Sequence, residues 1–179
     1  LSSGMTGMLS VYFIADRIVG IVSQVLGKAI ITPLATQFCH LTDSPEIVFK
    51  TIWRSSLLIL VLSLLGYSIL YFSLPVVNNL FVYFFSNSQA FYSKFTLMLF
   101  IFSGSIIGNL CSGIVSNAFY SKGSTKLPSY ISIVSYTFFL PIKYISYLNF
   151  GFIGLVFSIS IHALSNYFVL LFFFRYKYL

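Results

Sequence analysis

Long apolar runs are the feature of this sequence that most restricts its fold. A helix of about 20 apolar residues is long enough to cross the hydrocarbon core of a bilayer. Five runs have the length and composition for this, at about 6–38, 45–73, 90–119, 128–148 and 151–174. Charged residues make up only 7% of the chain, whereas a soluble domain has about 25%. The sequence therefore predicts an all-α, polytopic membrane helix bundle, with residues 1–179 forming a single transmembrane domain.

The charges are few but strongly unbalanced. Ten lysines and arginines stand against three acidic residues, which gives a net charge of +7. Most of the basic residues flank apolar runs, so the expected partners are membrane lipids with anionic head groups and any anionic substrate. The water-exposed segments have no basic patch interleaved with aromatic residues, so nucleic acid is not expected as a partner.

The first run carries polar side chains along one helical face. On a wheel that advances about 100° per residue, four of them fall within about 20° of Arg17: Thr6, Ser10, Gln24 and Lys28. This stripe is about 33 Å long, enough to cross a hydrocarbon core. Because an ionisable group in a membrane helix is costly unless it faces protein or water, the stripe predicts the wall of a hydrated cavity. The alternative is that Asp16 and Arg17 neutralise each other or reach the membrane interface.

Prolines mark expected irregularities in three of the runs. Pro33 should bend the first helix or loosen its last turns, and Pro141 should kink the fourth helix. Pro75 should end the second helix and leave 76–85 as a short re-entrant or interfacial segment. That second helix is expected to begin with Asp43 as N-cap and Glu46 in its first turn.

The third run is rich in small residues at four-residue spacing, namely Gly104, Gly108, Ser112 and Ser116. Small residues at this spacing let membrane helices approach closely, so the pattern predicts a helix contact. The alternative is that Asn109 or Asn117 on this segment touches a substrate.

Few residues suit catalysis or metal binding. Three acids and two histidines provide no pair of carboxylates and no Ser/His/Asp set, so an enzyme is not expected. The spacing of Cys39 and Cys111 matches no metal or disulfide pattern, and no cofactor is expected. His162 lies on a face of small and polar residues in the last run. It is expected to bond to a neighbouring serine, with titration in a cavity as the alternative.

The loops alternate in charge. Six basic residues fall on one side of the predicted membrane and two on the other; the six are Lys50, Arg54, Lys122, Lys126, Arg175 and Lys177. Cytoplasmic loops carry the excess of Lys and Arg. The prediction is therefore a C-terminus in the cytoplasm and residue 1 outside.

Three landmarks resemble one family. The stretch Ser10-Val-Tyr-Phe-Ile-Ala-Asp-Arg17, followed by Thr32-Pro33-Leu34, resembles the Y-x-A-D-R … P-x-L pattern of the MviN/MurJ-type lipid II flippases. Residues 118–128, Ala-Phe-Tyr-Ser-Lys-Gly-Ser-Thr-Lys-Leu-Pro, look like a loop of that family. Residues 149–155 look like its G-x-x-G-L helix start. The O-antigen flippases of the multidrug/oligosaccharidyl-lipid/polysaccharide exporter superfamily are relatives and stay open as an alternative.

The resemblance implies a two-lobed bundle of which these five helices are most of the second lobe. Residue 1 is Leu rather than Met, and we expect an N-terminal lobe of the same protein as a missing partner. The resemblance also implies alternating-access transport of an undecaprenyl-pyrophosphate-linked saccharide across the bacterial cytoplasmic (inner) membrane. In the flippases the arginine of A-D-R lines the central cavity, and Arg17 occupies that position. The expected substrate-binding residues are Arg17, Gln24, Lys28, Ser10 and His162.

Two other functions stay open. A cation-coupled drug exporter of the same superfamily would use intramembrane carboxylates, for which only Asp16 qualifies. A non-transporting, truncated half-transporter would only pack against a partner. If Arg17 meets the substrate, Asp16 points about 100° away and is expected to tie the first helix to a neighbouring one.

Overall fold

The protein is a bundle of long helices. The computed structural model describes the backbone of residues 2–41, 44–85 and 89–179, and the side chains of these residues except 2–7, 70, 73–85 and 89–92. The elements are α1 (Ser2–Leu26), the π-helical η1 (Gly27–Ile31), α2 (Thr32–His40), α3 (Pro45–Phe85), α4 (Gln89–Ser121) and α5 (Lys126–Tyr178). No strand occurs in the described ranges. The predicted all-α membrane fold is confirmed, with four helices long and apolar enough to cross a bilayer.

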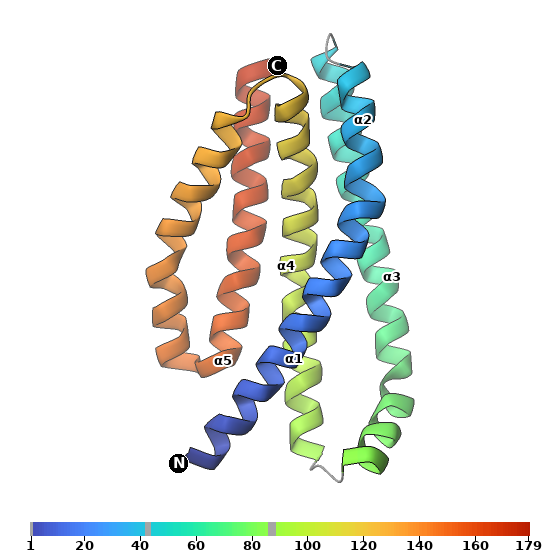
Figure 1. Cartoon of the computed structure of the whole chain (residues 1–179), viewed down its shortest axis with the longest axis vertical. Helices are drawn as coiled ribbons and strands as arrows, with labels where there is room; N and C mark the ends of the chain where they lie inside the picture. Colours follow the sequence, from blue (N-terminus) through green and yellow to red (C-terminus); the bar gives the residue numbers. More distant parts are fainter. Residues whose placement is uncertain (1, 42–43, 86–88) are drawn as a thin grey trace.

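The last of these helices is a hairpin. Gly151 has φ 62° and ψ −146°, while the rest of α5 is helical. A residue other than glycine is strained at this angle, because its Cβ would approach the backbone. Figure 1 shows the two resulting arms side by side, with the first arm (126–150) descending and the second arm (151–178) returning. The expected helices at 128–148 and 151–174 correspond to these arms, and the described residues therefore form five long helical segments.

Pro33 interrupts the regular α-helix, whereas Pro75 does not. Pro33 lies in the first turn of α2, directly after η1, so the first segment does loosen near this proline as expected. A proline ring crowds the carbonyl of the residue four positions earlier, which here is Ala29 inside η1. The wider π-helical turn relieves that conflict.

The prediction for Pro75 is wrong, because α3 continues through this residue to Phe85. In a membrane helix, neighbouring groups can satisfy the carbonyl that a proline leaves free. The residues 76–85 are therefore the end of α3 rather than a separate segment. In α5, Pro141 lies inside the first arm, and the only non-helical angles in Lys126–Tyr178 are those of Gly151. The expected cap Asp43 lies outside the described residues, while Glu46 is in the first turn of α3.

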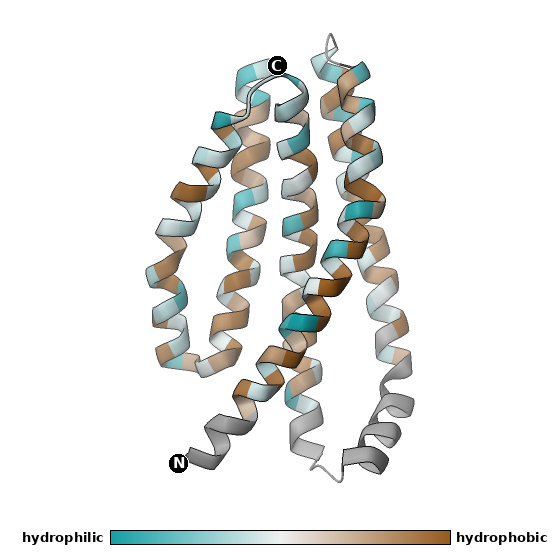
Figure 2. Ribbon diagram, viewed as in Figure 1, coloured by the Kyte–Doolittle hydropathy of each residue, from teal (hydrophilic) through white to brown (hydrophobic). Residues whose placement is uncertain are grey.

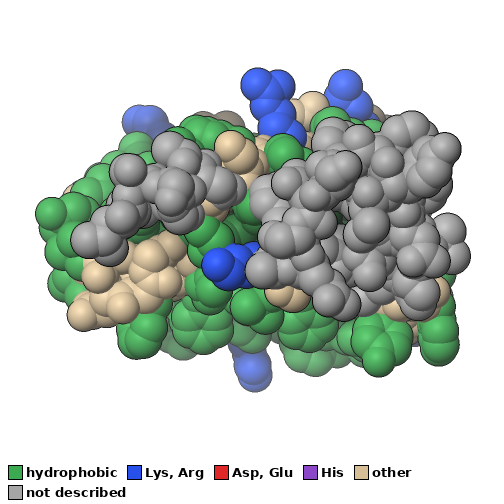
Figure 3. All heavy atoms as spheres, turned by 90° about the horizontal axis from the view of Figure 1, so that it is seen from below, with side chains coloured by type: hydrophobic (Ala, Val, Ile, Leu, Met, Phe, Trp, Pro, Cys, Tyr) green, Lys and Arg blue, Asp and Glu red, His purple; other side chains and the backbone are tan. Residues whose placement is uncertain are grey.

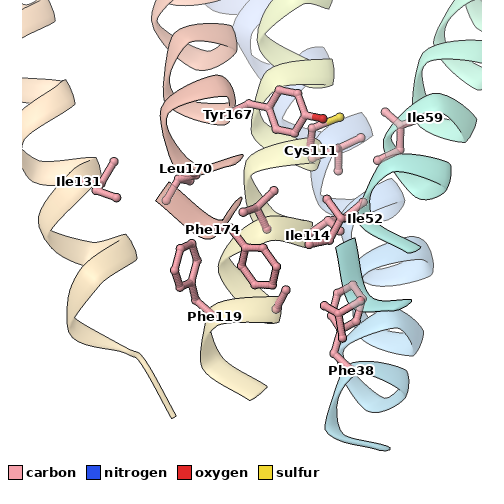
Figure 4. Packing of buried hydrophobic residues seen from close by; sticks show 14 residues of the cluster. Phe38, Ile52, Ile59, Cys111, Ile114, Phe119, Ile131, Tyr167, Leu170 and Phe174 are labelled. Atoms are coloured by element: carbon pink, nitrogen blue, oxygen red, sulfur yellow. The ribbon is translucent and has the colours of Figure 1, made fainter. Parts of the chain in front are cut away.

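The helix α4 is the centre of the bundle, with α1, α3 and α5 around it (Figure 1). One core cluster joins α4 to α2, α3 and the second arm of α5 through side chains that include Phe38, Ile52, Ile114 and Phe174. Figure 4 shows these side chains pointing toward one another. A second cluster, which includes Val11, Ala15, Met98, Phe102 and Val156, joins α1 to α4 and to the start of the second arm.

Much of the outside of the bundle is apolar. Large exposed side chains include Phe72, Tyr130, Phe138 and Phe172. Apolar residues are spread over all the helices in Figure 2, and hydrophobic side chains dominate the described part of the end seen in Figure 3. A surface of this kind suits a protein surrounded by lipid tails.

The connection between α4 and α5 and the C-terminus lie at the same end of the bundle, opposite the N-terminus (Figure 1). Lys177 Nζ donates a hydrogen bond to Ser124 Oγ at 3.0 Å, and Lys122 Nζ lies 5.3 Å from the centre of the Tyr178 ring. The segments that carry most of the basic residues thus share one side of the bundle.

Candidate functional site

The polar stripe lies on the outer face of α1. The opposite face packs against α4 through Val11, Ala15 and Val19, which are buried. These three lie roughly 120° to 200° around the helix from Arg17. The predicted site residues Ser10, Arg17, Gln24 and Lys28 are all exposed. The polar stripe and the packing face thus lie on opposite sides of α1, and the role of the stripe as a cavity wall stays a prediction.

Arg17 has no ion pair with Asp16. Among the described residues, no hydrogen bond or ion pair is formed by either side chain, and both are exposed. The alternative in which the two neutralise each other is not what the structure shows. The expectation that Asp16 ties α1 to a neighbouring helix is also wrong for the described residues. Both charges are exposed and can meet groups outside the described bundle.

Lys28 lies in η1, where the wheel no longer applies in full. A π-helical hydrogen bond spans five residues instead of four, so the advance of about 100° per residue ends after Leu26. Lys28 is exposed in the structure. It remains near the stripe, but its direction relative to Arg17 is set by the π-helical segment rather than by ideal helix geometry.

His162 belongs to a different part of the molecule. It lies on the second arm of α5, and its Nδ1 is 3.2 Å from Nζ of Lys143 on the first arm. The expected bond to a neighbouring serine is therefore wrong. The sequence does hold a signal for this pair. Lys143 precedes the Gly151 turn by eight residues and His162 follows it by eleven, so an antiparallel hairpin brings them to similar depths.

A separate apolar groove lies on the other side of α1. Its volume is about 380 Å³, and α1, α3 and α4 line it with residues that include Ile18, Leu62, Gly66 and Leu99. Its polar groups are occupied: Ser63 Oγ donates to Ile59 O at 2.7 Å, and Ser103 Oγ donates to Phe100 O at 2.6 Å. The groove offers little to an anion, so the candidate site is the outer face of α1.

The chemistry of that outer face is anion binding. A guanidinium and an ammonium point away from the bundle at positions that belong to an apolar helix. Such groups must face protein or water rather than lipid tails. Arginine can hold two oxygens of a phosphate or carboxylate with parallel hydrogen bonds. In the described part of the chain, no three His, Cys, Asp or Glu side chains are placed to hold a metal ion.

Comparison with known proteins agrees with the geometry. The family model described as lipid II flippase MurJ matches residues 1–178. The comparisons with curated proteins and with solved structures gave no match. The family match spans almost the whole chain, including the three landmarks at 10–34, 118–128 and 149–155. The chain therefore belongs to the MurJ family of lipid II flippases.

Proposed function

We propose that this chain moves an undecaprenyl-pyrophosphate-linked saccharide across the bacterial cytoplasmic membrane by alternating access. Members of its family are lipid II flippases, that is, transporters of a lipid-linked precursor in peptidoglycan biosynthesis. The single observation that carries the proposal for this chain is that Arg17 is exposed, on the face of α1 opposite its packing face, and has no ion pair among the described residues.

The pyrophosphate is the part of the substrate that suits this face. Its oxygens match the fork of a guanidinium, and Arg17 stays charged in a partly dehydrated site. Gln24 and Lys28 extend the polar face toward η1, and Ser10 lies toward the N-terminal end. The expected partner of this face is the N-terminal lobe of the same protein. Movement of the two lobes would expose the stripe to each side of the membrane in turn.

The orientation that we propose puts the C-terminus and the connection between α4 and α5 in the cytoplasm. The support is the excess of basic residues at this end. Cysteines introduced at Ser44 and Ser124, in a variant without Cys39 and Cys111, should be shielded from an impermeant thiol reagent in intact cells. Labelling of both positions from outside would reverse the orientation.

Binding of undecaprenyl pyrophosphate to the purified protein in lipid nanodiscs tests the role of Arg17. Arg17→Ala should weaken binding about tenfold to a hundredfold, because charge-assisted hydrogen bonds contribute about 1.5–3 kcal/mol. Arg17→Lys should bind with an affinity between those of the parent and Arg17→Ala, because lysine keeps the charge but cannot form the paired hydrogen bonds of a guanidinium. Arg54→Ala, which removes another exposed arginine, is the matched control and should bind normally. Normal binding by folded Arg17→Ala would exclude this role.

One observation favours testing the drug-exporter alternative as well. Asp16 is also exposed and unpaired among the described residues, and coupling cations bind intramembrane carboxylates. Asp16→Asn should leave undecaprenyl-pyrophosphate binding within about twofold of the parent if Arg17 is the anion-binding residue. Loss of binding in folded Asp16→Asn with normal binding in Arg17→Ala would reverse the two roles.

A further inference from the structure

The α5 hairpin holds a basic pair that the flippase proposal does not use. Lys143 Nζ lies 3.2 Å from His162 Nδ1, so one arm is hydrogen-bonded to the other through two side chains. Both residues belong to the apolar range Lys126–Tyr178. At about 1.5 Å per residue they lie roughly 12 Å and 16 Å from the Gly151 turn, within the depth of a hydrocarbon core.

Aromatic rings hold the pair in place. The Lys143 ammonium lies 4.6 Å from the centre of the Tyr136 ring, a cation–π distance. The His162 ring lies between Tyr136, at 5.9 Å, and Phe139, at 4.9 Å, measured between ring centres. His162 Nε2 is buried, and it has no hydrogen-bond partner among the described residues. The imidazole therefore has one nitrogen engaged with Lys143 and the other enclosed.

Among the described residues, no carboxylate balances the pair. The acids of the described chain are Asp16 on α1 and Glu46 at the start of α3, and neither forms an ion pair with Lys143 or His162. On the first arm, Tyr136 is an ionisable side chain in contact with both members of the pair. On α4, the groups closest to the second arm at this level are Gly104, Gly108 and the carbonyl of Ile101, none of which ionises. On α1, Tyr12 contacts Phe152 of α5 near the turn, and the other α1 side chains of the same core cluster, which include Val11 and Ala15, do not ionise.

This arrangement limits how many protons the pair can hold with its bond intact. The N–H···N bond needs a donor on one nitrogen and a free lone pair on the other. A protonated Lys143 therefore requires neutral His162 with Nδ1 unprotonated. A second proton on Nδ1 removes the acceptor and places two positive charges side by side without an anion, which favours separation of the two side chains.

We propose that the Lys143–His162 pair is a proton-binding site within the membrane. In the hydrogen-bonded form, Lys143 is protonated, and its ammonium group donates a hydrogen bond to Nδ1 of His162. When a proton from water binds Nδ1, the hydrogen bond breaks and the charge of the pair rises from one to two. Release of that proton to water restores the bond. Proton binding at this site thus changes the connection between the two arms of α5.

The chain allows a direct test, because His40 and His162 are its two histidines. A His40→Gln protein in nanodiscs, with ¹⁵N in its imidazole ring, reports on His162 alone by NMR. At pH 8 we expect Nδ1 without a proton and Nε2 with one. Both nitrogens should become protonated, reversibly, between pH 8 and pH 4.5. An Nδ1–H tautomer at pH 8, or no change over this range, would overturn the proposal.

Lys143→Met in the same background separates a proton site from a purely structural bond. Without the neighbouring charge, half-protonation of His162 should occur at a pH at least one unit higher, a tenfold change in proton affinity. Lys94→Met removes an exposed lysine elsewhere and should leave the titration unchanged. An equal titration in Lys143→Met and its parent would contradict the proposal. The readout needs no transport substrate, so it stands whether or not Arg17 binds pyrophosphate.

Discussion

The first helical segment, Met8–His40, which runs through α1, η1 and α2, is similar to α4 in composition but lies in the opposite environment. Both are long enough and apolar enough to cross a membrane, yet half of the residues in the most apolar part of α4 are buried, against 6% in that of the first segment. Average hydropathy therefore does not say which membrane helix lies at the centre of a bundle. The difference arises from the residues on each face.

In α4 the decisive residues are small. Gly108 faces the second arm of α5 so closely that an added Cβ would lie 2.5 Å from the carbonyl carbon of Ala163 and 2.6 Å from the nitrogen of Leu164. At Gly104 an added Cβ would lie 3.0 Å from the Cβ of Ser160. Such closeness lets backbones pack without a hydrophobic driving force between helices. In α1 the decisive residues are polar, and they point away from the bundle.

The substitution Gly108→Leu should cause the largest loss of stability, because it disrupts the close packing of α4 that distinguishes this helix from α1. The new side chain would meet backbone atoms, which cannot move aside as a flexible side chain can. The arms of α5 should separate from α4, and folded protein in detergent should fall below about a tenth of the parent level, a cost above 1.4 kcal/mol. Size-exclusion chromatography and thermal unfolding measure this.

The matched control is Gly20→Leu on α1, where an added Cβ would meet nothing within 4 Å. This variant should fold and melt like the parent. If Gly108→Leu and Gly20→Leu behave alike, the small residues of α4 do not form the contact that distinguishes it from α1.

The features that could be predicted from the sequence are those determined by residues close to one another along the chain. The spacing of Gly104 and Gly108 is a periodic pattern within one helix, and the structure places both in the predicted helix contact. The stripe around Arg17 is also periodic and lies on the exposed face of α1, while its role as a cavity wall stays a prediction. The sharp turn at Gly151 likewise depends on a local property, because glycine tolerates a positive φ. These features depend on residues that are close in the sequence.

The features that sequence reasoning missed depend on distant partners. The bond between His162 and Lys143 requires the register of the two arms of α5, which no pattern within one arm fixes. Pro75 failed to end α3 because a proline is only a local preference, and its surroundings decide whether the helix continues. The π-helical η1 likewise changed the direction of Lys28 from the one expected for a regular α-helix, although Pro33 had indicated an irregularity near this position.

A smaller effect is expected from Ser160→Ala at the same interface. Ser160 Oγ donates a hydrogen bond of 2.6 Å to the carbonyl of Ile101 and so joins the second arm to α4. Loss of an interhelical hydrogen bond in a membrane protein costs about 0.6 kcal/mol on average and up to about 1.7 kcal/mol. Thermal unfolding should show a modest decrease in stability. Ser129→Ala is the control, because Ser129 Oγ bonds to Thr125 O of its own turn and is exposed; an equal loss in both variants would mean that the interface adds nothing.

The smallest effect on stability is expected at the outer face of α1. Arg17 is exposed, and its substitution by Ala removes no hydrogen bond or ion pair among the described residues. Substitutions away from packed features usually change stability by less than about 0.5 kcal/mol. The unfolding temperature of Arg17→Ala should equal that of the parent even though pyrophosphate binding is weakened. This pairing of unchanged stability with weakened binding is the opposite of the result expected for Ser160→Ala, which should unfold more easily and bind normally. If Arg17→Ala were instead as destabilised as Gly108→Leu, the outer face of α1 would be a packing surface, and its contrast with α4 would disappear.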